Sequence, residues 1–191
     1  MTQTGRYVLV QIKDVDKRGF LHLGALVRVE APEAREDHLL HRGDVLLVAR
    51  GNRNRAAVFA GEIKGAIAGA QFYIIRPKNL VLPEYLAWYL NQTPAQRQIE
   101  ASLAGSFVPF IPREALEELQ VAVPTLEEQR RVVAIHELWL KEQELMEQIS
   151  GRRQQLVQGA LMKAVKPLSP FGKLVETAAR AAKDLDDHEN D

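Results

Sequence analysis

The 191-residue chain contains no cysteine. Disulfide bonds and thiolate zinc sites are therefore excluded, and a reducing cytoplasm is the expected compartment. No apolar run approaches the roughly 18 residues that a membrane-spanning helix needs, and the N-terminal residues lack the basic and then apolar pattern of a secretion signal. The formal net charge is zero, so the overall charge does not indicate a polyanionic partner. These absences favour a soluble, intracellular protein without a membrane partner.

Motifs of familiar enzyme classes are also missing. The sequence has no G-x-x-x-x-G-K-[ST] phosphate loop, no H-E-x-x-H zinc motif and no G-x-S-x-G nucleophile elbow. His38 and His41 are three residues apart, but no further cluster of metal ligands accompanies them. We therefore expect neither a metal site nor a cofactor.

Asp44, Glu62 and Lys64 form the one pattern that would suit catalysis. In a D…E-x-K nuclease site, two carboxylates bind Mg²⁺ and the lysine stabilises developing negative charge. A Glu-x-Lys pattern arises readily by chance in a chain with 26% charged residues. Asp44 also follows Gly43 in an ordinary turn position. A magnesium-dependent nuclease is therefore a minor alternative.

The sequence predicts a domain of short strands followed by helices. Hydrophobic residues make up 46% of the chain, which is enough for one core. Runs of β-branched and aromatic residues predict strands at 7–12, 26–29, 45–49, 56–61 and 71–77. Proline and glycine punctuation then predicts helices at 83–91, 94–104 and 113–120 and a last strand at 121–123.

Thr125 and Glu128 form a T-x-x-E capping box. In such a box the hydroxyl and the carboxylate each bond an unpaired backbone N–H of the first helical turn. No proline follows until Pro167. The pattern therefore predicts a single helix over residues 126–165, which is roughly 60 Å long at 1.5 Å per residue.

One stripe of this long helix is apolar at a spacing of three and four residues, and we call it the seam. The apolar seam residues are Ile135, Leu138, Leu145, Ile149 and Leu156, and the two polar seam residues are Glu142 and Arg152. An apolar stripe needs a covering surface, either the protein's own domain or a partner helix. Because a body of about 125 residues is too small to cover the whole helix, the pattern favours a partner helix.

Basic residues are concentrated between Arg42 and Leu82. This window holds seven basic and two acidic residues, so its net charge is +5 in a neutral chain. Its densest part is the segment RGNRNR, residues 50–55. Arginine can bond guanine and asparagine can bond adenine in the DNA major groove. Both a DNA-contacting turn and a solvated hairpin tip fit this pattern.

Four segments, in their order along the chain, resemble the target recognition domain and spacer helix of type I restriction-modification specificity subunits. They are RGDVLLVARG, AGAQFYIIRP, LPEYLAWYLNQ and GSFVPFIPREALEELQVAVPTLEEQRRVV, and the resemblance extends over residues 7–165. It implies an α+β fold, with a mixed α/β target recognition domain at 1–125 and one long spacer helix at 126–165. Residues 166–191 are expected to form a weak helix and then an acidic disordered end.

The resemblance also implies a function. Subunits of this family do no chemistry. They read double-stranded DNA and dock a methyltransferase subunit and, through it, a motor-nuclease restriction subunit. Full-length members carry two recognition domains and two antiparallel spacer helices, whereas this sequence shows one of each, so we expect two copies to associate through the seam.

Candidate DNA contacts are basic and polar residues in or beside the predicted loops. They are Arg50, Arg53, Asn54, Arg55 and Gln71, with Ser106 as a phosphate contact and Lys13 and Arg18 as secondary candidates. In the GSFVPFIP loop, Phe110 stands where many relatives carry a polar residue. Because of this departure and the neutral charge, an interaction or regulatory protein of the same fold that has lost DNA reading is an open alternative.

Overall fold

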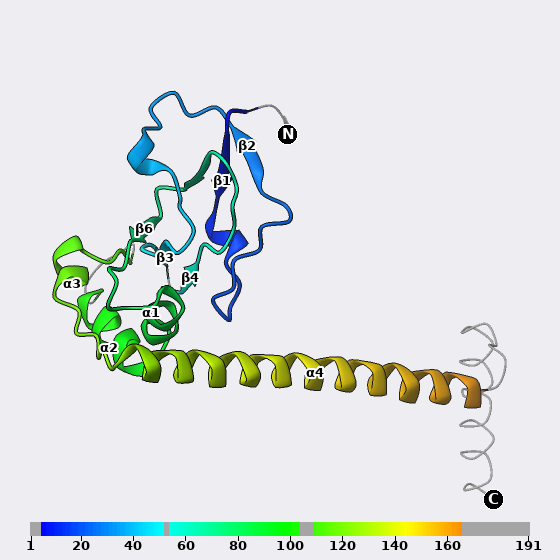
Figure 1. Cartoon of the computed structure of the whole chain (residues 1–191). Helices are drawn as coiled ribbons and strands as arrows, with labels where there is room; N and C mark the ends of the chain where they lie inside the picture. The colour runs from blue at the N-terminus through cyan, green and yellow to red at the C-terminus, as the bar shows by residue number, and fades with distance from the viewer. Residues whose placement is uncertain (1–4, 52–53, 104–108, 166–191) are drawn as a thin grey trace, which may run out of the picture. The chain divides into compact units, whose positions relative to one another are not determined.

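The computed structural model describes residues 5–51, 54–103 and 109–165 of the chain (Figure 1). The chain divides into two compact units, Met1–Trp139 and Leu140–Asp191. The first unit contains strands and helices, which confirms the α+β class. The division falls at Trp139 rather than at the start of the long helix, because the first turns of that helix pack within the first unit. In the described part of the chain, no helix is long and apolar enough to cross a membrane.

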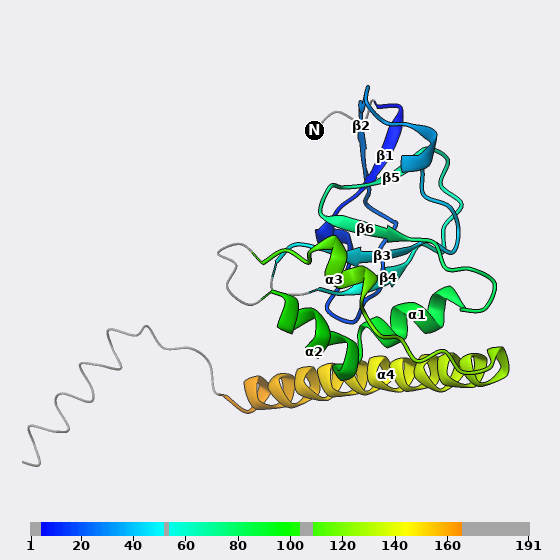
Figure 2. The same ribbon diagram turned by 90° about the vertical axis from the view of Figure 1, so that its left-hand side faces the viewer.

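The strands of the described residues form two small sheets. In the first sheet, β1 (Tyr7–Val10) lies between β2 (Val27–Val29) and β5 (Ala66–Ala68), antiparallel to β2 and parallel to β5. In the second sheet, β3 (Val45–Val48) lies between β4 (Ala56–Val58) and β6 (Phe72–Ile75) and is antiparallel to both. Figure 2 shows the two sheets as neighbouring groups of strands, with α1 and α2 on the side of the β4–β3–β6 sheet.

Strand β3 is buried on both faces, as its continuous apolar run predicts. Val45 and Leu47 point into a cluster with helical residues, whereas Leu46 and Val48 belong to a second cluster with β1 and Phe59. Alternate residues of one strand therefore supply two cores. Burying each leucine contributes about 2 kcal/mol to the free energy of unfolding.

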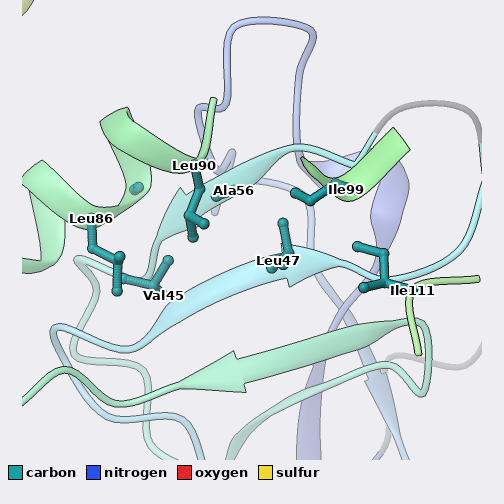
Figure 3. Close-up of a cluster of buried hydrophobic side chains, with 8 residues drawn as sticks. Val45, Leu47, Ala56, Leu86, Leu90, Ile99 and Ile111 are labelled. Carbon is teal, nitrogen blue, oxygen red and sulfur yellow. The ribbon is translucent and has the colours of Figure 1, made fainter. Parts of the chain in front are cut away.

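The first cluster joins the second sheet to the helices (Figure 3). Leu86 and Leu90 come from α1 (Pro83–Leu90) and Ile99 from α2 (Thr93–Ser102). All three pack against β3 with Ile111, which precedes the short helix α3 (Arg113–Glu117). These helices begin and end within a few residues of the predicted bounds, since Pro83 stands at the first position of α1 and Pro94 in the first turn of α2.

Two expectations about strands were wrong. Residues 121–123 are not a strand, and the Ala122 carbonyl accepts from the Tyr85 hydroxyl instead of from a neighbouring strand. The Gln98 side chain exchanges two hydrogen bonds with the backbone of Gln120, the residue before this segment. Strand β5 was not predicted. It is a three-residue segment of small residues that follows Gly65, whose positive φ of 74° favours glycine.

The long helix α4 spans Leu126–Ala164, and its capping box is formed as predicted. The Glu128 N–H donates to the Thr125 hydroxyl oxygen at 3.3 Å, and the Glu128 carboxylate accepts from the Thr125 N–H at 2.9 Å. The Thr125 hydroxyl also donates to that carboxylate at 2.8 Å. Hydrogen bonds from the Thr125 side chain and backbone hold the pKa of Glu128 below its ordinary value of 4.5.

Candidate nucleic-acid interface

One end of the β4–β3–β6 sheet gathers most of the predicted DNA contacts that the structure describes. The turn from β3 to β4 contains Arg50 and Arg55, and Gln71 directly precedes β6. Because β3 and β6 are antiparallel, the end of β3 lies beside the start of β6, and Val48 pairs with Phe72 (Figure 2). The Ala49 N–H donates to the Gln71 carbonyl at 2.7 Å. Two segments about twenty residues apart thus share one edge.

Arg50 is exposed at this edge and lies over an aromatic ring. Its guanidinium carbon is 5.2 Å from the centroid of the Phe110 ring, and that ring is 6.0 Å from the Tyr73 ring. Arg50 and Phe110 also form an isolated β-bridge, and the Gly51 N–H donates to the Pro109 carbonyl at 3.0 Å. A stacked guanidinium loses little freedom on binding. The Phe110 ring therefore supports the Arg50 side chain. The sequence showed only that Phe110 stands where many relatives carry a polar residue.

Arg55 is anchored to the end of α1 by a residue that sequence reasoning missed. Its Nη1 donates to the Asn91 carbonyl at 3.3 Å. The Asn91 side chain accepts from the Ala56 N–H at 3.0 Å and donates to the Ala56 carbonyl at 2.8 Å. Asn91 was expected to end a helix, which it does, but no local pattern indicated its pairing with β4.

A turn at residues 16–20 packs against Ala56 and Asn91, the two residues paired at the start of β4. Gly19 has a φ of 84°, and a Cβ built there would lie 2.7 Å from the Ala56 carbonyl oxygen. Burial alone would raise the pKa of Asp16, but hydrogen bonds from Phe20, His22 and Arg18 outweigh it and lower this pKa below 3.8. The turn thereby holds the backbone of Arg18 near the start of β4. Lys13 is exposed on the one-turn helix Ile12–Asp14.

The remaining predicted DNA contacts are Asn54, Arg53 and Ser106. Asn54 is buried, and its amide donates to the Val48 carbonyl at 2.9 Å. The side chain therefore stabilises the β3–β4 turn, and we do not include it among the proposed DNA contacts. Arg53 and Ser106 lie outside the described residues.

The basic window of residues 42–82 does not form one patch. Arg76 pairs with the buried Asp44, with Nε 3.2 Å from Oδ1, at the opposite end of β3 from Arg50. Arg42 pairs with Glu62 at 3.4 Å on the surface. Lys64 precedes Gly65, whose carbonyl accepts from the N–H of Val8 in the other sheet. Among the described residues of the window, Arg50 and Arg55 lie together between β3 and β4, and we call them, with Gln71, the basic edge.

The pairing of Asp44 bears on the nuclease alternative. Its carboxylate accepts from the Arg76 guanidinium and from the His41 N–H at 2.9 Å, so its oxygens already have donors. Glu62 is exposed and paired with Arg42. Within the described ranges, no group of three His, Asp or Glu residues could hold a metal ion. Asp44 thus has a structural role directly before β3.

The seam of α4 is exposed along its length. Ile135 and Leu138 lie in the first unit with 68% and 72% of their surface accessible, and Leu145, Ile149 and Leu156 lie in the second unit at 46%, 66% and 75%. Ile135 and Leu138 therefore do not pack against the domain of their own unit. The side chains leave an apolar face that a partner can cover.

Two solved structures share this fold. The HsdS subunit from Thermoanaerobacter tengcongensis superposes with a TM-score of 0.67 at 20% sequence identity, over 86% of this chain and 45% of that chain. A chain of the type I R-M system, from work on its complex assembly and conformational transition, superposes with a TM-score of 0.67 at 23% identity, over 87% of this chain and 45% of that chain. This chain therefore spans less than half the length of either.

The resemblance seen in the sequence is confirmed at the level of the fold. No family model matches the sequence. No curated protein matches it either. The likeness is thus one of fold, and it extends over 86% and 87% of this chain.

Proposed function

We propose that the chain reads sequence in double-stranded DNA as the recognition component of a type I restriction-modification specificity subunit and does no chemistry itself. The observation that carries the proposal is the shared fold with an HsdS subunit over 86% of the chain. The basic edge supports it, because a reading surface needs exposed, positioned donors. Fold alone does not specify function, so the proposal depends on these side chains.

Arg50 is the residue best placed to read a base. It is exposed, and the Phe110 ring supports its guanidinium, which can donate two parallel hydrogen bonds to guanine O6 and N7. Gln71, also exposed beside it, has an amide that suits adenine. Arg55 and Arg18 lie near the start of β4, where they would contact phosphates and set the register of the domain on the duplex. Lys13 would add a further phosphate contact.

The partners follow from the same proposal. A reading module without catalytic groups has an effect only if it positions an enzyme, so we propose a methyltransferase subunit and, through it, a restriction subunit as partners. The exposed seam of α4 supports an assembly role and would hold a second copy of the chain. Two recognition domains would then read two half-sites separated by a gap.

Selection of bound sequences from randomised duplexes tests the proposal, with the pure chain alone and with the methyltransferase subunit. We expect a preferred sequence in at least one condition. Arg50→Ala should weaken binding to that sequence by about 1–3 kcal/mol and relax the preference at one position. Arg50→Lys keeps the charge but loses the bidentate bond, so it should also relax the preference. Arg42→Ala, at the far end of β3, is the matched control and should change neither.

A regulatory protein without DNA reading is the second candidate function. The observation that favours it is the split of the basic residues by the fold, in a chain with zero net charge. The Arg50→Ala/Arg55→Ala double variant separates the two. Unchanged sequence preference of the assembled methyltransferase would support regulation, whereas loss of preference would support DNA reading.

A further inference from the structure

We propose that the seam of α4 pairs with the seam of a second copy of this chain in an antiparallel arrangement, with the two-fold axis at Glu147, so that Glu142 of each copy faces Arg152 of the other. The inference rests on the self-association in the proposed function. The antiparallel direction agrees with the two antiparallel spacer helices that the resemblance implies, and the new element is the register of the pairing, which the resemblance does not supply for this chain.

The seam lies opposite the face by which α4 packs on its own domain. In the first unit, Gln129 is fully buried and His136 is partly buried against Trp88, whereas Ile135 and Leu138 are exposed. At about 100° per residue, the seam is centred roughly 180° around the helix from Gln129. A second helix can therefore cover the seam without displacing these packed side chains.

The spacing of the seam residues fixes the possible registers. They alternate between the a and d positions of a heptad repeat, and antiparallel pairing places an a residue opposite a d residue in each layer. With the axis at Glu147, the layers are Leu138 with Leu156, Leu145 with Ile149, Glu142 with Arg152, and Ile135 with Gly159. Nothing lies within 4 Å of the position where a Gly159 Cβ would stand, so there is room for the isoleucine.

This register pairs the two charges of the seam with each other. Within the described residues, neither Glu142 nor Arg152 has an ionic partner in its own chain. Covering the seam removes both side chains from water, and a buried charge is tolerated only when it is paired. The proposed register supplies that partner twice, once on each side of the axis.

Other arrangements leave the charges uncompensated. A shift of one heptad in one direction places Glu142 against Leu145 and Arg152 against Ile135. The shift in the other direction places Arg152 against Ile149 and Lys163 against Leu138. A parallel pair in register places Glu142 against Glu142 and Arg152 against Arg152, which is repulsive. Among these arrangements only the register at Glu147 satisfies both charges.

The charge distribution along the whole of α4 supports the same direction. All six glutamates of the helix stand at or before Glu147, and the charged residues after it are Arg152, Arg153 and Lys163. An antiparallel pair places the acidic half of one helix beside the basic half of the other. A parallel pair places like charges side by side and is disfavoured.

Charge reversal in the full chain tests the register, with sedimentation equilibrium as the readout. Glu142→Arg and Arg152→Glu should each weaken the dimer at least about tenfold, and the double variant should restore it to near the wild-type affinity. Glu137→Arg, an exposed charge away from the seam, is the matched control and should have little effect. A double variant that stays as weak as the single variants would overturn the register.

The absence of cysteine permits a direct measurement of direction. Chains with Leu138→Cys and chains with Leu156→Cys should form a disulfide only when the two are mixed, because a disulfide needs Cα atoms within about 7 Å. Crosslinking of either variant with itself would indicate parallel helices and would overturn the proposal. Circular dichroism of each variant checks that the helix is intact.

Self-association and DNA reading fail separately in these experiments. A wild-type chain that stays monomeric at all concentrations tested would overturn the pairing, and so would a seam that only the methyltransferase subunit covers. Either result leaves the duplex-selection assay, which measures DNA reading, unaffected. Loss of sequence preference in a chain that still crosslinks as expected would instead overturn the proposed function and leave the pairing standing.

Discussion

The side chain of Gln129 joins the long helix to the start of α1, because its Oε1 accepts a hydrogen bond from the Leu82 N–H at 2.8 Å. Its Nε2 donates to the carbonyls of Leu80 and Pro124, each at 2.9 Å. The side chain is fully buried. One glutamine thus satisfies three backbone groups and fixes the first turn of α4 against the domain.

We expect Gln129→Leu to destabilise the first unit by about 2–4 kcal/mol, because three buried backbone groups lose their partners. Gln129→Glu should also be destabilising, since a carboxylate accepts from Leu82 but cannot donate to the two carbonyls. Urea unfolding measures both. Gln155→Leu, at an exposed position of the same helix, is the control and should change stability by less than about 0.5 kcal/mol. Equal effects at the two positions would contradict this account.

Asp44 and Arg76 give a second prediction. The Asp44 side chain is 5% exposed and also accepts the His41 N–H, so Asp44→Ala should lower the free energy of unfolding by about 3 kcal/mol. The exposed pair of Arg42 and Glu62 is the natural comparison, and Glu62→Ala should cost less than about 1 kcal/mol. Thermal and urea unfolding of the two variants give the comparison. A stable Asp44→Ala protein would indicate that the carboxylate serves something other than the fold.

His136 makes stability depend on pH. Burial against the Trp88 and Trp139 rings lowers its pKa below 6.5, although the Glu137 carboxylate acts in the opposite direction. As the pH falls through 6.5, the unfolded chain therefore binds the proton first. The stability that neutral His136 contributes is present above pH 6.5 and is lost as the pH falls toward the folded-state pKa.

The measurement is the melting temperature of the wild type and of His136→Gln at pH 7.5 and pH 5.5. We expect the wild type to lose more on acidification, because glutamine cannot be protonated. An NMR titration of His136 should give a pKa below 6.5. A midpoint above 6.5 would reverse the predicted sign.

Local signals explain why much of the fold was predictable from the sequence. The apolar run of β3 indicated burial on both faces, and Pro83 marked the start of α1. The Thr125 and Glu128 pair located the start of α4 to the residue. Each of these features depends on neighbouring residues in the chain. The strand predicted at residues 121–123 does not form, and the hydroxyl of the distant Tyr85 bonds the Ala122 carbonyl that a strand would have used.

The candidate site was less predictable for the same physical reason. Arg50 and Arg55 were found from composition, but their supports, Phe110 and Asn91, come from positions at least 36 residues away along the chain. The burial of Asn54 could not be predicted from the sequence either, because every residue of RGNRNR is typical of a solvent-exposed turn. Charge in a sequence window does not specify which side chains meet, and the fold placed Arg76 at the opposite end of β3.

The last prediction concerns Gly19, which joins the turn of residues 16–20 to the basic edge. A Cβ there would lie 2.7 Å from the Ala56 carbonyl oxygen and 2.7 Å from Asn91 Nδ2, in a backbone conformation with φ of 84°. Gly19→Ala should therefore cost about 1–3 kcal/mol of stability. It should also weaken DNA binding, because displacing the Asn91 side chain breaks its two hydrogen bonds to Ala56, the residue next to Arg55.

Gly24→Ala is the matched control, since nothing lies within 4 Å of a Cβ built at Gly24. Both variants are compared by urea unfolding and by duplex binding under conditions where each is fully folded. If Gly19→Ala loses stability but keeps full DNA affinity, the turn supports the fold only and Arg55 does not depend on Asn91. Loss of affinity in the folded Gly19→Ala protein, with Gly24→Ala unchanged, would tie the turn to DNA reading, because a methyl group reaches the Ala56 and Asn91 contact only in Gly19→Ala.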